Sequence, residues 1–290
     1  MIGNIPIVTF DTSAHNRLVD DGPLSEPVLE KIRSDMFFRF GGSCLEELFA
    51  TKCSARRADL FAYCRRLEKG QNDTILPCNL LLTCLVLNYF KNPSAFDWRT
   101  VNVSVNILGS GVEFVDDEEN SKKQKEQQIL LKKEFDRAFL LDRANNREIF
   151  ETHGELLPST FREVITRLWN AGGKLITGFG KLLYNLAAEE DGTDSTVLEF
   201  MDGCPPFRAV VYALLMSWYS QSLSNEGTGE KFEAGRYDQF MAIYLPYCDK
   251  FVTAEKKREQ EKCLREVAAV AGLETEVLSY DRFRESLKIA

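Results

Sequence analysis

The chain has 290 residues, of which 44% are hydrophobic and 28% are charged, and its formal net charge is −8. This composition is typical of a folded protein with a sizeable core, and it argues against nucleic-acid binding over most of the surface. The eight cysteines form no Cys-x-x-Cys pair and most lie among apolar residues, which indicates reduced thiols and a cytoplasmic protein. The N-terminus has no signal-peptide pattern, and no window reaches the ~18 apolar residues of a membrane span, so we expect neither export nor a membrane.

The first segment, residues 5–10, is apolar and β-branched without a helical period, and it runs directly into the polar sequence DTSAHNRL. This pattern predicts a short buried strand of a parallel sheet. Residues 25–34 then predict a helix, because Ser25 can cap its start, Pro27 suits its first turn and an apolar face follows.

A second strand is expected at 36–40, where the sequence is MFFRF. Two helices should follow, the first in SCLEELFAT and the second in SARRADLFAYCRRLEKG, which Gly70 ends as a C-terminal cap. Residues 101–117 predict a short strand or hairpin, and the charged run 116–128 predicts a solvated helix or linker.

The middle of the chain looks helical throughout. Apolar residues recur at helical spacing in 161–169 and again in 175–186, on either side of Gly172–Gly173, so two amphipathic helices are expected. Residues 207–223 are apolar nearly all round, which indicates a helix buried on most sides; it is too short for a membrane span and contains Arg208.

Strand patterns return at 250–255 and 275–280, and they flank a charged amphipathic helix, 255–271, that Gly272 ends. This is a β-α-β unit. We therefore expect one α/β core built from both ends of the chain, with a helical insertion between them. The predicted division is a core with an N-terminal part, an inserted mostly helical region and a C-terminal part, at residues 1–100, 101–230 and 231–290.

Several carboxylates stand at the ends of these predicted elements. Asp11 directly follows the first strand, the Glu46–Glu47 pair begins a helix after the second strand, Asp238 opens a helix before the strand at 250–255, and Glu255 directly follows that strand. Each residue alone is more often a turn, a helix cap or a partner of the helix dipole. Together they would converge, because parallel strands end at one edge of a sheet, where open α/β folds bind their ligands.

Converging carboxylates suit hard divalent cations. Mg²⁺ and Mn²⁺ prefer oxygen ligands, and Mg²⁺ usually takes only a few carboxylates from the protein and keeps several waters. A bound cation lowers the pKa of its water and neutralises charge on phosphoryl oxygens, which serves phosphodiester hydrolysis without a Ser, Cys or His nucleophile.

Three segments, in this order, resemble the four motifs of PIN domains. IPIVTFDTSAHNRLVDD is similar to the first motif, SCLEELFAT to the second, and YDQFMAIYLPYCDKFVTAEKKR to the third and fourth. The resemblance covers roughly the first 70 and the last 60 residues. The long middle region matches nothing in small PIN toxins.

The resemblance implies a PIN-like central parallel sheet flanked by helices, and a Mg²⁺- or Mn²⁺-dependent nuclease that acts most often on RNA. The family's four acidic positions fall on Asp11, Glu47, Asp238 and Glu255, and Ser13 and Thr253 fall where outer hydrogen-bonding residues lie. The chain departs from the family at Glu255, because the last position more often holds Asp or Asn. Glu46 is the alternative to Glu47 if the phase of that helix differs.

The sequence-based hypothesis is a metal-dependent endonuclease, with an endoribonuclease as the first choice. One alternative is a catalytically degenerate PIN-like protein-interaction module, and another is a structure-specific DNA nuclease. The resemblance leaves open a role as the toxin of a toxin–antitoxin pair with an inhibitory protein partner, in defence or in RNA processing, and it leaves open a homodimer.

Other polar residues have simpler explanations. His15 and His153 are too few for a zinc site without suitably spaced cysteines, so His15 is interpreted as structural. Two groups of basic residues could contact a nucleic-acid backbone, although a solvated helix face is the ordinary interpretation. The first group is Arg56, Arg57, Arg65 and Arg66, and the second is Arg167, Lys174 and Lys181.

Overall fold

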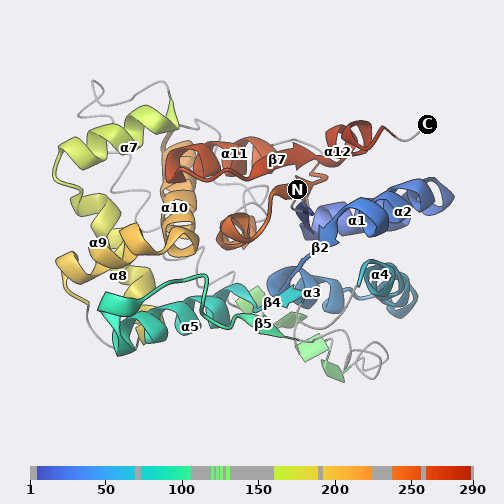
Figure 1. Cartoon of the computed structure of the whole chain (residues 1–290), viewed down its shortest axis with the longest axis horizontal. Helices are drawn as coiled ribbons and strands as arrows, with labels where there is room; N and C mark the ends of the chain where they lie inside the picture. The colour runs from blue at the N-terminus through green and yellow to red at the C-terminus, as the bar shows by residue number, and fades with distance from the viewer. Residues whose placement is uncertain are drawn as a thin grey trace.

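The computed structural model describes residues 5–68, 73–105, 160–188, 192–223, 237–255 and 259–288, together with short helical pieces between 119 and 130. Among these residues the central element is a parallel sheet of order β2-β1-β6-β7 (Figure 1). Its strands are β1 (Ile7–Phe10), β2 (Phe37–Phe38), β6 (Lys250–Thr253) and β7 (Glu276–Ser279). The predicted α/β class is confirmed, and both ends of the chain contribute to one sheet.

Alternation along these strands sends side chains into two separate cores. Phe251 and Val277 belong to one hydrophobic cluster, whereas their neighbours Val252 and Leu278 belong to the other. Successive side chains of a strand point to opposite faces, so both faces of this sheet are covered, as parallel sheets require.

The strand predicted at 36–40 is divided between two sheets. Arg39 N donates to Val8 O of β1 at 2.9 Å, but Phe40 N donates to Asp73 O at 2.7 Å. A Cβ at Gly42 would lie 2.5 Å from Pro77 N, so glycine permits the close approach of the two backbones. The second sheet has the order β3-β4-β5, with β3 at Phe40–Gly41, β4 at Thr74–Ile75 and β5 at Ser104–Val105.

One face of the central sheet packs on an aromatic core. Phe10 of β1 makes edge contacts with Phe38 and Phe283, with ring centroids 5.1 and 5.4 Å apart. Ser25 is at the N-cap position of the predicted helix at 25–34, but its hydroxyl makes no capping hydrogen bond and donates instead to Gly22 O. The helices of this side are α1 (Thr12–Asp20), η1 (Gly22–Ser25), α2 (Glu26–Asp35), α4 (Ser54–Leu67) and α12 (Tyr280–Ser286), and α3 (Gly42–Phe49) lies beside α1 and α4.

The opposite face packs on the middle of the chain and on the helix that precedes β7. The two amphipathic helices on either side of Gly172–Gly173 are confirmed, and both glycines have positive φ angles, +88° and +66°. Figure 1 shows α7 to α10 gathered away from α1, α2 and α4. The elements of this side are α5 (Cys78–Lys91), η2 (Pro93–Ala95), α7 (Phe161–Asn170), α8 (Lys174–Ala188), α9 (Asp194–Gly203), α10 (Pro205–Leu223), η5 (Tyr237–Tyr247) and α11 (Glu259–Ala271).

Arg208 of α10 links the middle region to the C-terminal part of the chain. Its guanidinium donates to Met201 O and Asp202 O of α9 and to Ala271 O at the end of α11, at 3.1 to 3.3 Å. A cation is favourable at helix C-termini, where carbonyl groups lack helical partners. One side chain therefore closes two helix ends, and the helices of the middle region share a continuous core with η5 and α11.

Other sequence predictions concern a helix end, the cysteines, membrane spans and the segment after residue 100. Gly272, with a φ of +70°, ends α11 as predicted. All eight cysteines are free thiols. None of the described helices is both long and apolar enough to cross a membrane. Gly70 and most of residues 106–128 lie outside the described residues, so the hairpin at 101–117 is represented only by β5, and the division at residues 100 and 230 stays a prediction.

Candidate functional site

The candidate site lies where the order of strands reverses direction. From β1 the chain continues to β2 on one side, and it returns much later as β6 on the other side of β1. Asp11 directly follows β1 and its backbone N donates to Val252 O of β6 at 3.0 Å. Open α/β sheets bind ligands at such switch points, outside the carboxyl ends of the strands.

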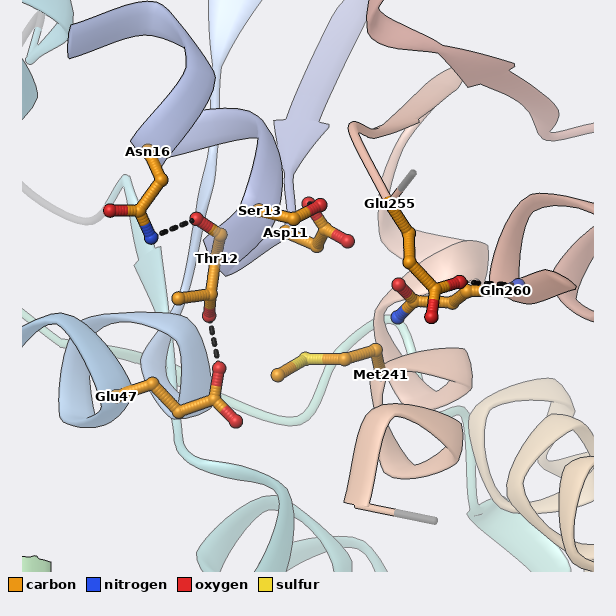
Figure 2. A pocket seen from close by; sticks show the side chains of 8 residues that line it. All are labelled: Asp11, Thr12, Ser13, Asn16, Glu47, Met241, Glu255 and Gln260. Atoms are coloured by element: carbon orange, nitrogen blue, oxygen red, sulfur yellow. Dashed lines mark hydrogen bonds between the residues drawn. The ribbon is translucent and has the colours of Figure 1, made fainter. Parts of the chain in front are cut away.

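A cavity of about 260 Å³ opens at this edge of the sheet. Three of the four predicted carboxylates, Asp11, Glu47 and Glu255, lie in its wall, with Glu47 and Glu255 on either side of Asp11 (Figure 2). Glu47 rather than Glu46 lines it. Among the residues that the structure describes, the lining is Asp11, Thr12, Ser13, Asn16, Glu47, Met241, Glu255 and Gln260, none of which carries a positive charge.

The fourth predicted carboxylate is placed only by its backbone. Asp238 lies at the start of η5, but its side chain is outside what the structure describes. Met241 of the same 3₁₀ helix lines the cavity. Residues three apart share one face of a 3₁₀ helix, so position 238 shares a face with Met241.

Asp11 is the most enclosed of these carboxylates, with 3% of its surface exposed. It caps α1, and its Oδ1 accepts hydrogen bonds from Ala14 N and from the Ser13 hydroxyl, both at 2.7 Å. Burial raises the pKa of Asp11 from 3.8 to about 6, and the negative charge of Glu255 adds to the rise. The nearby Thr253 hydroxyl and the hydrogen bonds from Ala14 and Ser13 offset only part of it.

Ser13 and Thr253, the predicted outer residues, hold the ends of β1 and β6 together. Besides donating to Asp11, the Ser13 hydroxyl accepts from Ala254 N at 2.7 Å and lies 3.3 Å from Thr253 Oγ1. Thr253 Oγ1 in turn donates to Gln260 Oε1 at 3.1 Å. These bonds fix the orientation of Asp11 relative to the segment that carries Glu255.

The other two carboxylates are also oriented by neighbours. The Thr12 hydroxyl donates to Glu47 Oε2, which joins α1 to α3. Gln260 N, in the first turn of α11, donates to Glu255 Oε2 at 2.8 Å.

Four residues of the lining were not predicted from the sequence: Thr12, Asn16, Met241 and Gln260. Thr12 directly follows Asp11, and Asn16 lies one helical turn after Thr12, so the helical phase of α1 could have indicated both. Gln260 comes from a helix whose position depends on the whole fold. A single sequence carries no signal for it.

His15 is structural, as interpreted from the sequence. It is buried against Phe10, Phe38 and Phe40, and its ring is stacked on that of Phe40. Burial lowers its pKa from 6.5 to about 3, so the ring is neutral at physiological pH. Its Nδ1 lies 3.8 Å from the Cys64 thiol, and it is not part of the cavity lining.

The predicted basic side of α4 is only partly a surface. Arg57 is buried and donates to Thr51 O, so it does not belong to the solvated face. Arg66 is paired with Glu26. Arg56 remains partly exposed and lies next to the cavity through its hydrogen bonds to Asn16.

The second predicted basic face is likewise only partly available for nucleic acid. Lys181 forms an ion pair with Asp194 at 3.0 Å. That pairing supports the ordinary interpretation of a solvated helix surface at this position.

The carboxylate oxygens in the cavity wall are ligands of the kind that Mg²⁺ and Mn²⁺ bind. In the part of the chain that the structure describes, no three His, Cys, Asp or Glu side chains lie close enough to share one ion. The chain matches no family model, no curated protein and no solved structure.

Proposed function

We propose that this protein is a metal-dependent endonuclease with a PIN-like core, and that its substrate is RNA. Asp11, Glu47, Asp238 and Glu255 would hold Mg²⁺ or Mn²⁺. The observation that supports this most strongly is the shared cavity. Three carboxylates from distant segments line it at the switch point of a parallel sheet, where the resemblance to PIN domains also predicts the site.

The chemistry of the cavity fits a divalent cation. Asp11 is ionised at neutral pH against the cost of burial and the repulsion of Glu255, and none of the described residues that line the cavity is a Lys or Arg that would offset this charge. A bound cation would favour the ionised carboxylates by direct attraction. The lining therefore has oxygen ligands for a cation and an excess of negative charge that a bound cation would neutralise.

The chain's own residues would orient the reacting groups. When bound, the metal would activate water and neutralise charge on the phosphoryl oxygens. Ser13 would hold Asp11 through Oδ1, Thr12 would hold Glu47, and Gln260 would hold Glu255. These outer hydrogen bonds limit the rotation of the carboxylates and so help to preorganise the site.

A second candidate is a PIN-like protein-interaction module without activity. It is favoured by the absence of a three-ligand group among the described side chains, and by the hydrogen bonds that already engage Glu47 and Glu255. A structure-specific DNA nuclease would use the same cavity. Substrate comparison separates it from the first candidate.

Cation titration and cleavage assays test the proposal together. Mn²⁺ at about 100 times its Kd should stabilise the wild type by about 2.7 kcal/mol, a rise in melting temperature of roughly 5 to 10 °C. The same protein should cleave end-labelled single-stranded RNA internally when Mn²⁺ is present. Asp11→Asn and Asp238→Asn should each lower cleavage by about 100-fold or more, because each removes a charged ligand.

Asp59→Asn is a matched control, because Asp59 is an exposed residue of α4. It should keep both the Mn²⁺ response and the activity of the wild type. No cation response and no cleavage of RNA or branched DNA, with Asp11→Asn indistinguishable from the wild type, would favour the interaction module. Faster cleavage of branched DNA than of RNA would favour the DNA nuclease.

A further inference from the structure

Within the described parts of the chain, Arg56 is the basic side chain that the hydrogen bonds connect most directly to the cavity lining. Its NH2 group donates to Asn16 O at 3.0 Å and to Asn16 Oδ1 at 3.2 Å, and it forms an ion pair with Asp20 at 2.7 Å. Asn16 itself is anchored, because its Nδ2 donates to Thr12 O at 2.9 Å. The chain of contacts therefore leads from the cavity wall to the guanidinium.

The hydrogen bonds and the ion pair of this guanidinium with the described residues involve one of its nitrogens. All its contacts with the described residues involve NH2, whereas arginine carries five N–H donors in a rigid fork. The side chain is 28% exposed, so part of it faces solvent. A planar group held at one nitrogen is preorganised to donate to a phosphate with the others.

Further positive charge lies in the connection that leads from α3 to α4. Lys52 is exposed in the connection between α3, which carries Glu47, and α4, which carries Arg56. Lys125 is close enough to Lys52 for that charge to contribute to lowering the pKa of Lys125, after the larger effect of burial. Two lysines near each other on an acidic protein are a local positive region.

We propose that Arg56, with Lys52 four residues before it in the chain, binds backbone phosphates of the nucleic-acid strand that enters the cavity. This basic rim would position the strand so that a neighbouring phosphodiester reaches the carboxylates. The inference rests on the proposed nuclease function and adds the direction from which the substrate strand approaches. Phosphate contacts carry no base information, so the rim would bind strands of any sequence.

Binding of a fluorescent single-stranded RNA oligonucleotide, measured in EDTA over a range of salt concentrations, tests the rim. Arg56→Ala should weaken binding roughly 10-fold and reduce the salt dependence of log K by about 0.7, the contribution of one phosphate contact on a single strand. Lys52→Ala should reduce the slope by a similar amount. In Mn²⁺ cleavage assays, both should raise KM and leave kcat nearly unchanged, because they remove ground-state binding.

Two controls separate phosphate binding from a structural role. Asp20→Asn breaks the ion pair of Arg56 but keeps the guanidinium, so it should bind RNA as tightly as the wild type or more tightly. Arg65→Ala removes an exposed charge from the opposite end of α4 and should change neither KM nor slope. Arg56→Lys should keep the salt slope while weakening binding through loss of the fork.

The outcomes distinguish this inference from the function on which it rests. Wild-type cleavage together with unchanged KM and salt slope in Arg56→Ala would overturn the rim alone. The same loss of binding in Asp20→Asn would also overturn it, because the ion pair and not the phosphate contact would then explain the effect. A wild type that neither binds nor cleaves nucleic acid would overturn the rim and the proposed function together.

Discussion

Replacing Asp11 by Asn should stabilise the metal-free protein, although the residue is buried and hydrogen-bonded. The pKa of Asp11 rises from 3.8 to about 6 on folding. A group whose folded pKa is raised stabilises the protein below 3.8, and this stability is lost as the pH rises through 6. At pH 7.5 the ionised carboxylate therefore costs the folded state about 3 kcal/mol relative to the unfolded chain.

Asparagine removes this cost and keeps most of the local structure. Its side-chain oxygen can still accept from Ala14 N and from Ser13, and Asn is as good a helix cap as Asp. In urea denaturation without metal, Asp11→Asn should gain up to about 3 kcal/mol at pH 7.5 and only about 1 kcal/mol at pH 4.5. With saturating Mn²⁺ the wild type should become more stable than Asp11→Asn, because the wild type alone would gain the free energy of metal binding.

The pH dependence is the decisive part of this measurement. Asp59→Asn, on the exposed surface of α4, should differ from the wild type by less than about 0.5 kcal/mol at both pH values. A metal-free Asp11→Asn protein that is less stable than the wild type at pH 7.5 would refute the reasoning. In that case the charge of Asp11 would already be compensated within the folded chain.

Substitutions of His15 and Arg208 test the contributions of one residue on each side of the sheet to stability. His15 has a folded pKa of about 3, below its ordinary 6.5, so its contribution is full above pH 6.5 and is lost as the pH falls. From pH 7 to pH 5 the free energy of unfolding of the wild type should therefore fall by about 2 kcal/mol more than that of His15→Phe. Equal decreases for the two proteins in urea denaturation would contradict the interpretation of His15 as a buried neutral residue. Arg208→Ala should lower the free energy of unfolding by about 3 kcal/mol, because carbonyls of two helices lose a charged donor. As its control, Arg162→Ala removes one long contact to Ala269 O at the surface and should cost under about 1 kcal/mol in the same urea denaturation experiment.

The positions of the carboxylates could be predicted because they depend on local patterns. A short apolar run followed at once by Asp11, and another followed by Glu255, indicate two strand ends. Parallel pairing then brings both ends to one edge without further information. Glu47 is predicted from the resemblance of SCLEELFAT to a family motif, with Glu46 as the alternative, and the structure places Glu47 and not Glu46 in the cavity wall.

Features that depend on tertiary packing could not be predicted. Helix α5 gives little periodic signal, because the segment is apolar on most sides and Leu80, Leu87 and Phe90 remain exposed while its other face is buried. The strand at 36–40 looks continuous in sequence, yet its last residue pairs with a segment more than thirty residues later. Gln260 reaches the cavity only because α11 packs beside the end of β6, and no local pattern encodes that distance.

The two candidate explanations for Asp11 differ in what they require of its charge. As a helix cap, the residue needs an oxygen that accepts from Ala14 N, and asparagine would supply one without an ionisable group. As a metal ligand, it needs the charge, which burial and Glu255 make unfavourable in the absence of a cation. The structural role alone therefore leaves the aspartate unexplained, whereas a cation would convert the same electrostatic cost into binding energy. For this reason Asp11→Asn should be more stable than the wild type without metal and less stable than the wild type with Mn²⁺.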